Sequence, residues 1–189
     1  AMILADGLLG QMMEPVSFPE INANPTDKSS WAADGHKGKR EHHIVNSLYL
    51  KPDELEKSVA DRFARYETIK ANETDAELYL TEDCDILLCA FGATARVVKS
   101  AVNEARAPGI KAGLFRPKTL WPFPVKELNE AAKSAKKLLS VEMSMGQMID
   151  DIKLAINCSK PVEFYGRTGG VIPNPAEILA EIKKVGGAE

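Results

Sequence analysis

The 189-residue sequence has few of the residues that build metal or redox centres. It contains three cysteines, Cys84, Cys89 and Cys158, and no Cys-x-x-Cys pair. Iron–sulfur clusters and structural zinc sites need several thiolates at short spacing, so neither is expected within this chain. Cys89 lies in an apolar run and is expected to be a buried thiol. Few and widely spaced cysteines fit a reducing compartment, for which the cytoplasm is the simplest choice.

The sequence also lacks a strong charge of one sign and long apolar runs. Its formal net charge is −3, which gives no positive field for nucleic acid or an anionic membrane, so neither is expected as a partner. The apolar runs are far shorter than the roughly 20 residues that cross a bilayer. Hydrophobic residues make up 44% and charged residues 27%, which is ordinary for a globular protein. A chain of this length can hold one α/β domain with a core, plus an appendage.

The first 52 residues show little regular patterning. Residues 2–6 are strand-like but have no visible partner nearby, so we interpret residues 1–14 as the end of an upstream domain. Residues 15–52 form a connector arm in which several prolines and glycines leave no helical or strand period. Connectors of this length are usually functional or wrapped on a partner. Residues 44–50 are expected to form a short strand or an extended segment of that arm.

A helix is predicted from Asp53 to about Lys70, within a linking segment that covers residues 53–76. Pro52 is tolerated at a first helical turn, and acidic residues follow it. An apolar stripe at helical spacing supports the prediction and consists of Leu55, Val59, Phe63, Tyr66 and Ile69. A short strand is predicted at residues 77–80.

Residues 77–189 alternate strand and helix patterns and are predicted to form one domain. Strands are expected at residues 86–91, 110–115, 138–143 and 161–165, with helical stripes between them. Asn174-Pro-Ala-Glu177 resembles a capping box with proline at the first helical position of the last helix. This alternation predicts a mainly parallel sheet with helices on both faces, a three-layer αβα sandwich.

Two loops at the carboxyl edge of the predicted sheet carry the candidate binding residues, because ligands of open α/β sheets lie at this edge. The first is a glycine turn that opens a helix, whose free N–H groups can bind a phosphate or carboxylate. The second combines a carboxylate and an amide after the strand at 138–143. The candidates are Gly92, Thr94, Arg96, Glu142, Gly146 and Gln147. The alternatives are a plain strand–helix turn for the first loop and a hydrogen-bonded loop anchor for Glu142.

A proline-rich loop from Arg116 to Pro124 is a candidate interface. Its residues Trp121 and Phe123 offer a large apolar surface at low entropy cost, and its prolines stiffen it. The candidate interface residues are Arg116, Trp121, Pro122 and Phe123. The alternatives are a loop that folds back on its own core, and direct contact with a substrate.

The other polar segments are interpreted as ordinary loops and turns rather than binding sites. His36, His42 and His43 lie among basic residues without an acidic cluster, which disfavours a metal site and favours a solvated or partner-facing loop. Arg167-Thr-Gly-Gly170 is either an anion-binding turn or a plain turn before the last helix. No Ser/His/Asp, Cys/His or paired-carboxylate arrangement stands out, so no catalytic residue and no metal ligand is assigned.

Four segments in order resemble a known family: Ala5–Glu14, Asp85–Arg96, Arg116–Pro124 and Glu142–Met148. Together they resemble the α subunit of 2-oxoacid:ferredoxin oxidoreductases, most closely the 2-ketoisovalerate or 2-oxoglutarate type. The string from Arg116 to Pro124 is highly specific, whereas each of the other segments is weak alone.

The resemblance implies an enzyme that decarboxylates a 2-oxoacid on thiamine diphosphate, passes electrons through iron–sulfur clusters to ferredoxin and transfers the acyl group to coenzyme A. It implies that residues 1–14 are a remnant of a pyrimidine-binding domain. It also implies that residues 77–189 form a domain like the C-terminal domain of transketolase, with five strands, one of them antiparallel at 77–80.

The residues that bind the cofactors would lie elsewhere in the complex. The resemblance implies that thiamine diphosphate, magnesium and the clusters belong to other segments or subunits, namely a thiamine-binding β subunit, a γ subunit and a ferredoxin-like δ subunit. This chain would then serve assembly and be inactive alone. The alternatives are a stand-alone nucleotide- or anion-binding α/β module, and a structural interaction domain whose arm wraps a partner.

Overall fold

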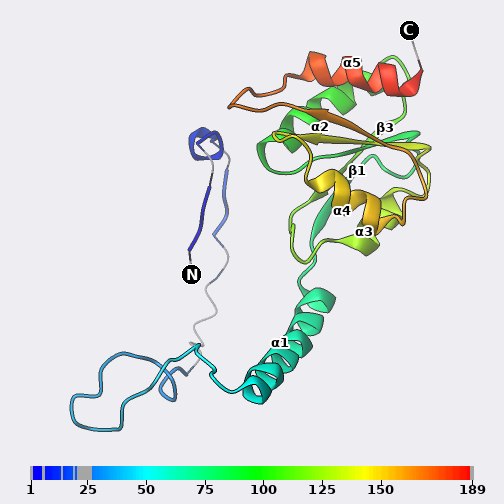
Figure 1. The fold of residues 1–189 in the computed structure, drawn as a ribbon. Coiled ribbons are helices and arrows are strands. Elements are labelled where there is room, and N and C mark those ends of the chain that lie inside the picture. Colours follow the sequence, from blue (N-terminus) through cyan, green and yellow to red (C-terminus); the bar gives the residue numbers. More distant parts are fainter. Residues whose placement is uncertain (1, 6, 14, 19, 21–26, 188–189) are drawn as a thin grey trace. The chain divides into compact units, whose positions relative to one another are not determined.

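The computed structural model describes residues 2–5, 7–13, 15–18, 20 and 27–187. The chain divides into two compact units, one over residues 1–11 and 66–189 and the other over residues 12–65. The first unit contains the sheet and the second contains the arm (Figure 1). Each unit is described by itself below.

The sheet has five strands in the order β1-β3-β2-β4-β5. The edge strand β1 pairs antiparallel with β3, and all other pairs are parallel. The predicted five-stranded, mostly parallel sheet with one antiparallel strand is confirmed. The strands are β1 (Ala76–Tyr79), β2 (Ile86–Cys89), β3 (Ala112–Pro117), β4 (Lys137–Glu142) and β5 (Val162–Gly166).

Helices cover both faces of the sheet, which makes the predicted three layers (Figure 1). The helices α2 (Gly92–Arg106) and α5 (Pro175–Gly186) pack on one face, where they share a core with β2, β3 and β4. The helices α3 (Val125–Ala131) and α4 (Met148–Ala155) pack on the other. The inner strands β2, β3 and β4 therefore each contribute buried side chains to both cores, as expected for strands covered on both faces.

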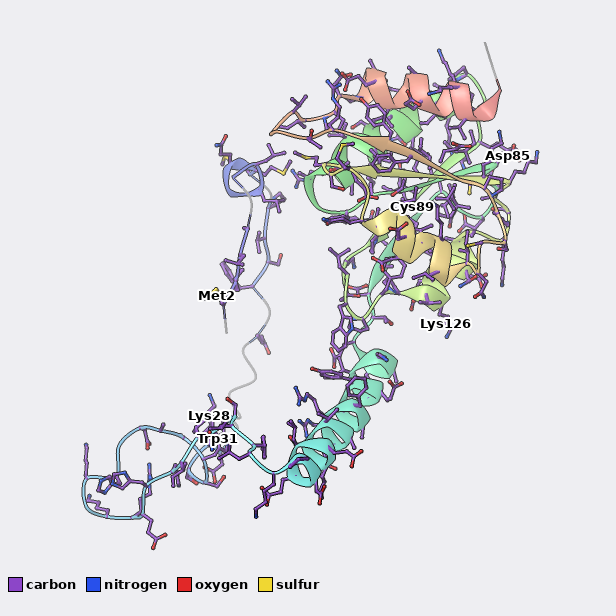
Figure 2. All side chains as sticks on the ribbon, viewed as in Figure 1. Met2, Lys28, Trp31, Asp85, Cys89 and Lys126 are labelled. Atoms are coloured by element: carbon purple, nitrogen blue, oxygen red, sulfur yellow. The ribbon has the colours of Figure 1, made fainter. Side chains whose placement is uncertain are left out.

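The central strand β2 divides its side chains between the two layers. Ile86 and Leu88 enter the core beneath α2 and α5, whereas Leu87 and Cys89 enter the core beneath α3 and α4. Successive side chains of a strand point to opposite faces, so this division follows from the backbone. Cys89 is fully buried, as predicted, and burial raises the pKa of its thiol (Figure 2).

Several predicted boundaries differ from the observed ones. Residues 2–5 form no strand, and neither do residues 44–50; Asp6 lies outside the described residues. The strand β2 ends at Cys89 rather than residue 91, since the chain turns there into Gly92, whose φ is +58°. The strand β3 begins at Ala112 rather than residue 110, because the Ile110 amide donates to the Ala105 carbonyl and closes the turn after α2.

The helix α1 (Pro52–Asn72) extends across the predicted range and slightly beyond it. No residue of this helix is buried, and its apolar stripe is exposed at Leu55, Val59 and Phe63. A short 3-10 turn, η1 (Leu9–Gln11), precedes the arm.

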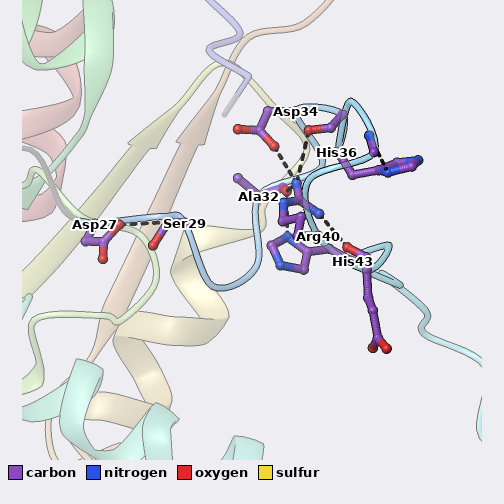
Figure 3. A network of polar contacts seen from close by, with 10 residues as sticks. Asp27, Ser29, Ala32, Asp34, His36, Arg40 and His43 are labelled. Carbon is purple, nitrogen blue, oxygen red and sulfur yellow. Dashed lines mark hydrogen bonds and ion pairs between the residues drawn. The ribbon is translucent and has the colours of Figure 1, made fainter.

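The arm contains a local polar network centred on Arg40 (Figure 3). The Arg40 guanidinium pairs with the Asp34 carboxylate at 2.6 Å and donates to the carbonyl of Ala32. The His43 ring bonds that same carbonyl at 2.8 Å. These contacts hold residues 32–43 as a closed loop, so part of the predicted connector has local structure without a helix or strand.

The last helix α5 begins with the predicted capping box. The side-chain oxygen of Asn174 accepts a hydrogen bond from the backbone amide of Glu177 at 2.9 Å. In return, the Glu177 carboxylate accepts one from the backbone amide of Asn174 at 3.1 Å. Glu177 also accepts from Tyr165 and pairs with Arg167. The cap therefore connects α5 to the end of β5.

Replacing this cap is expected to destabilise the sheet unit measurably. The Asn174→Ala change removes the acceptor of the Glu177 amide, so we expect a loss of about 1 kcal/mol in the free energy of unfolding. Urea unfolding followed by circular dichroism measures it. Glu104→Ala on the exposed side of α2 is the control and should change stability less, and equal losses would contradict a capping role.

Candidate binding cleft at the carboxyl edge of the sheet

A cleft of about 590 Å³ lies where the strands β2 and β4 end. These strands are neighbours, yet the chain leaves β2 through α2 toward β3 on one side and reaches β4 only later on the other. The order of strands thus reverses at this point, which is where open α/β sheets bind ligands. The residues that line the cleft are Phe91, Gly92, Ala93, Thr94, Glu142, Met143, Ser144, Gln147, Gly170 and Ile172, with Gly7, Leu8 and Gln11.

Glu142 anchors the second loop with its carboxylate. It accepts from the hydroxyls of Ser140 and Ser144, each at 2.9 Å, and from the backbone amides of residues 147–149 at 2.9 to 3.1 Å. Burial alone would raise the pKa of Glu142, but these hydrogen bonds outweigh burial and hold the pKa below its ordinary value. Glu142 is therefore a charged cap of helix α4, which agrees with the loop-anchor interpretation.

The N-terminus of helix α2 has no such cap. Its N-cap residue, Phe91, is extended and provides no side-chain acceptor. Within the described part of the chain, no acceptor is bonded to the amides of residues 92–94. A Cβ atom added at Gly92 would meet nothing within 4 Å, so the space in front of this helix end is open.

The structure brings together four of the six residues predicted for this edge. Gly92, Thr94, Glu142 and Gln147 line the cleft, and Arg96 and Gly146 are not among its lining residues. Gly146 instead lets the loop turn, with φ at +106°. Sequence reasoning missed the two serine partners of Glu142, although a serine two residues before and another two residues after a buried carboxylate is a usable signal.

The loop after β3 combines buried and exposed aromatic rings. Phe123 is half-buried, and its ring centroid lies 6.2 Å from that of Phe115 in the core. Pro122 is buried, and the bond from Trp121 to Pro122 is cis. Trp121 is 56% exposed and makes an edge contact with Tyr66 at 5.2 Å between centroids. Part of the loop thus folds back on the core, and Trp121 remains at the surface.

A second cleft of about 540 Å³ adjoins Trp121, with the end of α1 on one side and the start of α3 on the other. Its lining residues are Lys70, Ala71, Thr74, Trp121, Pro122, Phe123, Val125, Lys126 and Glu127. Arg116 does not line it, since its guanidinium bonds Glu77 on β1 at 3.1 Å.

The remaining polar patterns form no site. The rings of His36 and His42 lie 4.1 Å apart, yet no group of three or more His, Cys, Asp or Glu side chains suited to a metal occurs in the described ranges. Arg167 is paired with Glu177 in the turn before α5.

No helix in the described part of the chain is long and apolar enough to cross a membrane.

Comparisons with known proteins agree in pointing to one family. Residues 84–178 match the family described as pyruvate:ferredoxin oxidoreductase core domain II. The ketoisovalerate oxidoreductase subunit VorB of Methanothermobacter marburgensis is 43% identical over 98% of this chain and 52% of its own length. The 2-oxoglutarate synthase subunit KorA of the same organism is 42% identical over 57% of this chain and 29% of its own length.

A solved structure supports the fold. The 2-oxoglutarate:ferredoxin oxidoreductase from Magnetococcus marinus, solved with 2-oxoglutarate, coenzyme A and succinyl-CoA, aligns with a TM-score of 0.60 at 24% identity. The alignment covers 72% of this chain and 24% of that one. The chain spans about half the length of the VorB relatives it matches. The matched residues make up half of the chain, so the chain belongs to the pyruvate:ferredoxin oxidoreductase core domain II family.

Proposed function

We propose that the chain is the C-terminal part of the α subunit of a thiamine-diphosphate-dependent 2-oxoacid:ferredoxin oxidoreductase, with a role in assembly. The observation that carries the proposal is the 43% identity to a ketoisovalerate oxidoreductase subunit over nearly the whole chain. The complete enzyme would convert a 2-oxoacid, coenzyme A and oxidised ferredoxin into an acyl-CoA, carbon dioxide and reduced ferredoxin. The thiamine-binding, γ and ferredoxin-like subunits would be the partners of this chain.

The surface around Trp121 supports the assembly role. A tryptophan with 56% of its surface exposed, beside a cleft with apolar walls, is typical of a contact that another surface covers. Lys70 and Lys126 flank this cleft and can meet carboxylates of the covering surface. We therefore propose the Trp121 surface as a contact with the rest of the oxidoreductase.

The chain is expected to be inactive alone. The purified chain is mixed with 2-ketoisovalerate, thiamine diphosphate, Mg²⁺, coenzyme A and an oxidised viologen dye, and reduction of the dye is followed by its colour. We expect no reduction above a protein-free control, because the described residues contain no assembled catalytic group. Turnover by the chain alone would overturn the assembly role.

A binding assay tests the positive half of the proposal. The tagged chain is co-expressed with the N-terminal half of the VorB subunit and the other subunits of that enzyme, and co-purification is expected. Trp121→Glu should weaken it at least about tenfold, which is the effect of losing a central interface residue. Leu154→Glu is the matched control, since Leu154 is 74% exposed on α4 outside the Trp121 cleft. Equal effects of the two changes, or no co-purification, would contradict the proposed contact.

A further inference from the structure

We propose that the cleft between β2 and β4 binds a small ligand through an oxyanion, a carboxylate or a phosphate, held at the N-terminus of helix α2. The ligand would place an apolar body against Phe91, Met143 and Ile172. This site is independent of the assembly role proposed above, because it lies at the sheet edge and does not include Trp121.

The two helices that begin at this cleft differ in one respect. The first amides of α4 all donate to the Glu142 carboxylate, which the chain supplies itself. The first amides of α2, in a helix of 15 residues, have no acceptor among the described residues. Free N–H groups and the positive end of the helix dipole both favour an anion. The molecule therefore fills one helix end with its own carboxylate and leaves the neighbouring one open to the cleft.

The hydroxyl of a nearly buried threonine provides the second observation. Thr94 is 5% exposed and lines the cleft, and its hydroxyl makes no hydrogen bond to any residue that the structure describes. The hydroxyl oxygen is not among the fully enclosed atoms that lack a partner, so it is open to the cleft and available to a ligand. An oxyanion at the start of α2 would accept from this hydroxyl together with the free amides.

The remaining polar lining fits an anion despite the acidic residue nearby. The Glu142 carboxylate is already engaged by five donors, two hydroxyls and three amides at the positive end of α4, which screen part of its negative charge. The Gln147 side-chain amide also lines the cleft, is exposed, and has no hydrogen bond within the described residues. It can add a neutral donor. The strand order also reverses at this point, where ligands of such sheets bind.

The proposal is tested by nuclear magnetic resonance on the full chain labelled with ¹⁵N. Inorganic phosphate and sodium acetate are titrated separately against sodium chloride at matched ionic strength. We expect saturable shifts of the amides of Gly92, Ala93 and Thr94 with at least one of the two anions. Saturation by phosphate alone identifies a phosphate ligand, and saturation by acetate alone identifies a carboxylate. If neither anion moves these amides more than chloride does, the site is refuted.

Substitution of the N-cap residue gives the sharpest test. Phe91→Asp places a carboxylate of the chain itself at the start of α2, as Glu142 does for α4, so anion binding should weaken at least about tenfold. Leu154→Asp is the matched control, because it adds the same charge at a position on α4 that is 74% exposed and does not line the cleft, so it should keep the amide shifts. Binding of the anion to the Phe91→Asp chain with unchanged affinity would overturn the proposal.

The hydroxyl is tested by a second pair of variants. Thr94→Val keeps the shape of the side chain and removes the donor, so the dissociation constant should rise several-fold, by about the factor of one hydrogen bond. Thr81→Val is the control, because Thr81 is also buried but lies before β2, at the opposite end of the strand. Equal effects of the two changes would remove Thr94 from the site.

Discussion

Phe115→Ala should lower the free energy of unfolding of the sheet unit by about 3–5 kcal/mol, the usual cost of truncating a buried phenylalanine. Phe115 lies in β3, is fully buried, and belongs to the core beneath α3 and α4. The neighbouring Phe123 ring is only half-buried and cannot fill the space without leaving its own position. Urea unfolding monitored by circular dichroism measures the loss.

The control for this change is Phe18→Ala, because Phe18 is 92% exposed. Its truncation should change the stability by less than about 0.5 kcal/mol, as is usual for surface positions. If Phe115→Ala costs no more than the control does, Phe115 does not have the packing role that its burial indicates.

Glu142→Ala should cost about 3 kcal/mol, because it removes the acceptor of three backbone amides and two hydroxyls at a buried position. The donors then face a cavity that only water can fill. The same unfolding measurement applies. Glu163→Ala on the exposed side of β5 is the matched control and is expected to change stability little.

The contribution of Glu142 should also depend on pH. Its pKa in the folded chain is held below the ordinary value, so the unfolded chain takes up the proton first as the pH falls. The stabilisation is therefore fully present above the unfolded pKa of about 4.3 and is lost as the pH falls through the lower folded pKa. The stability difference between the wild type and Glu142→Gln should shrink over that window. A difference that stays constant down to pH 2 would show that the charge of Glu142 contributes nothing.

The sheet was predictable because its inner strands are buried on both faces. A run such as Ile86–Cys89 has no polar position, and only a central strand with helices above and below can bury all four side chains. The capping box at Asn174 was equally readable, since its two bonds join residues three apart. Both signals are local, so one sequence contains them completely.

Features that depend on distant partners were not readable. Residues 2–5 are apolar like a strand, yet a strand needs a partner, and sequence composition does not supply one. The Glu142 carboxylate was expected to need donors, but that two serine hydroxyls would join the backbone amides depends on how the loop closes. The unbonded hydroxyl of Thr94 is likewise a property of the assembled cleft, because it exists only once β2 and β4 are neighbours.

The two edge strands of the sheet affect whether copies of this protein can associate edge to edge. Unpaired edges can recruit strands from other chains into aggregates, and short edges with charged side chains resist this. The edge strand β1 has four residues and contains Glu77, which is held by Lys99 and Arg116. The opposite edge, β5, has five residues and contains the exposed Glu163. Both edges are short and contain charged side chains, so each end of the sheet discourages the addition of a strand from a second copy.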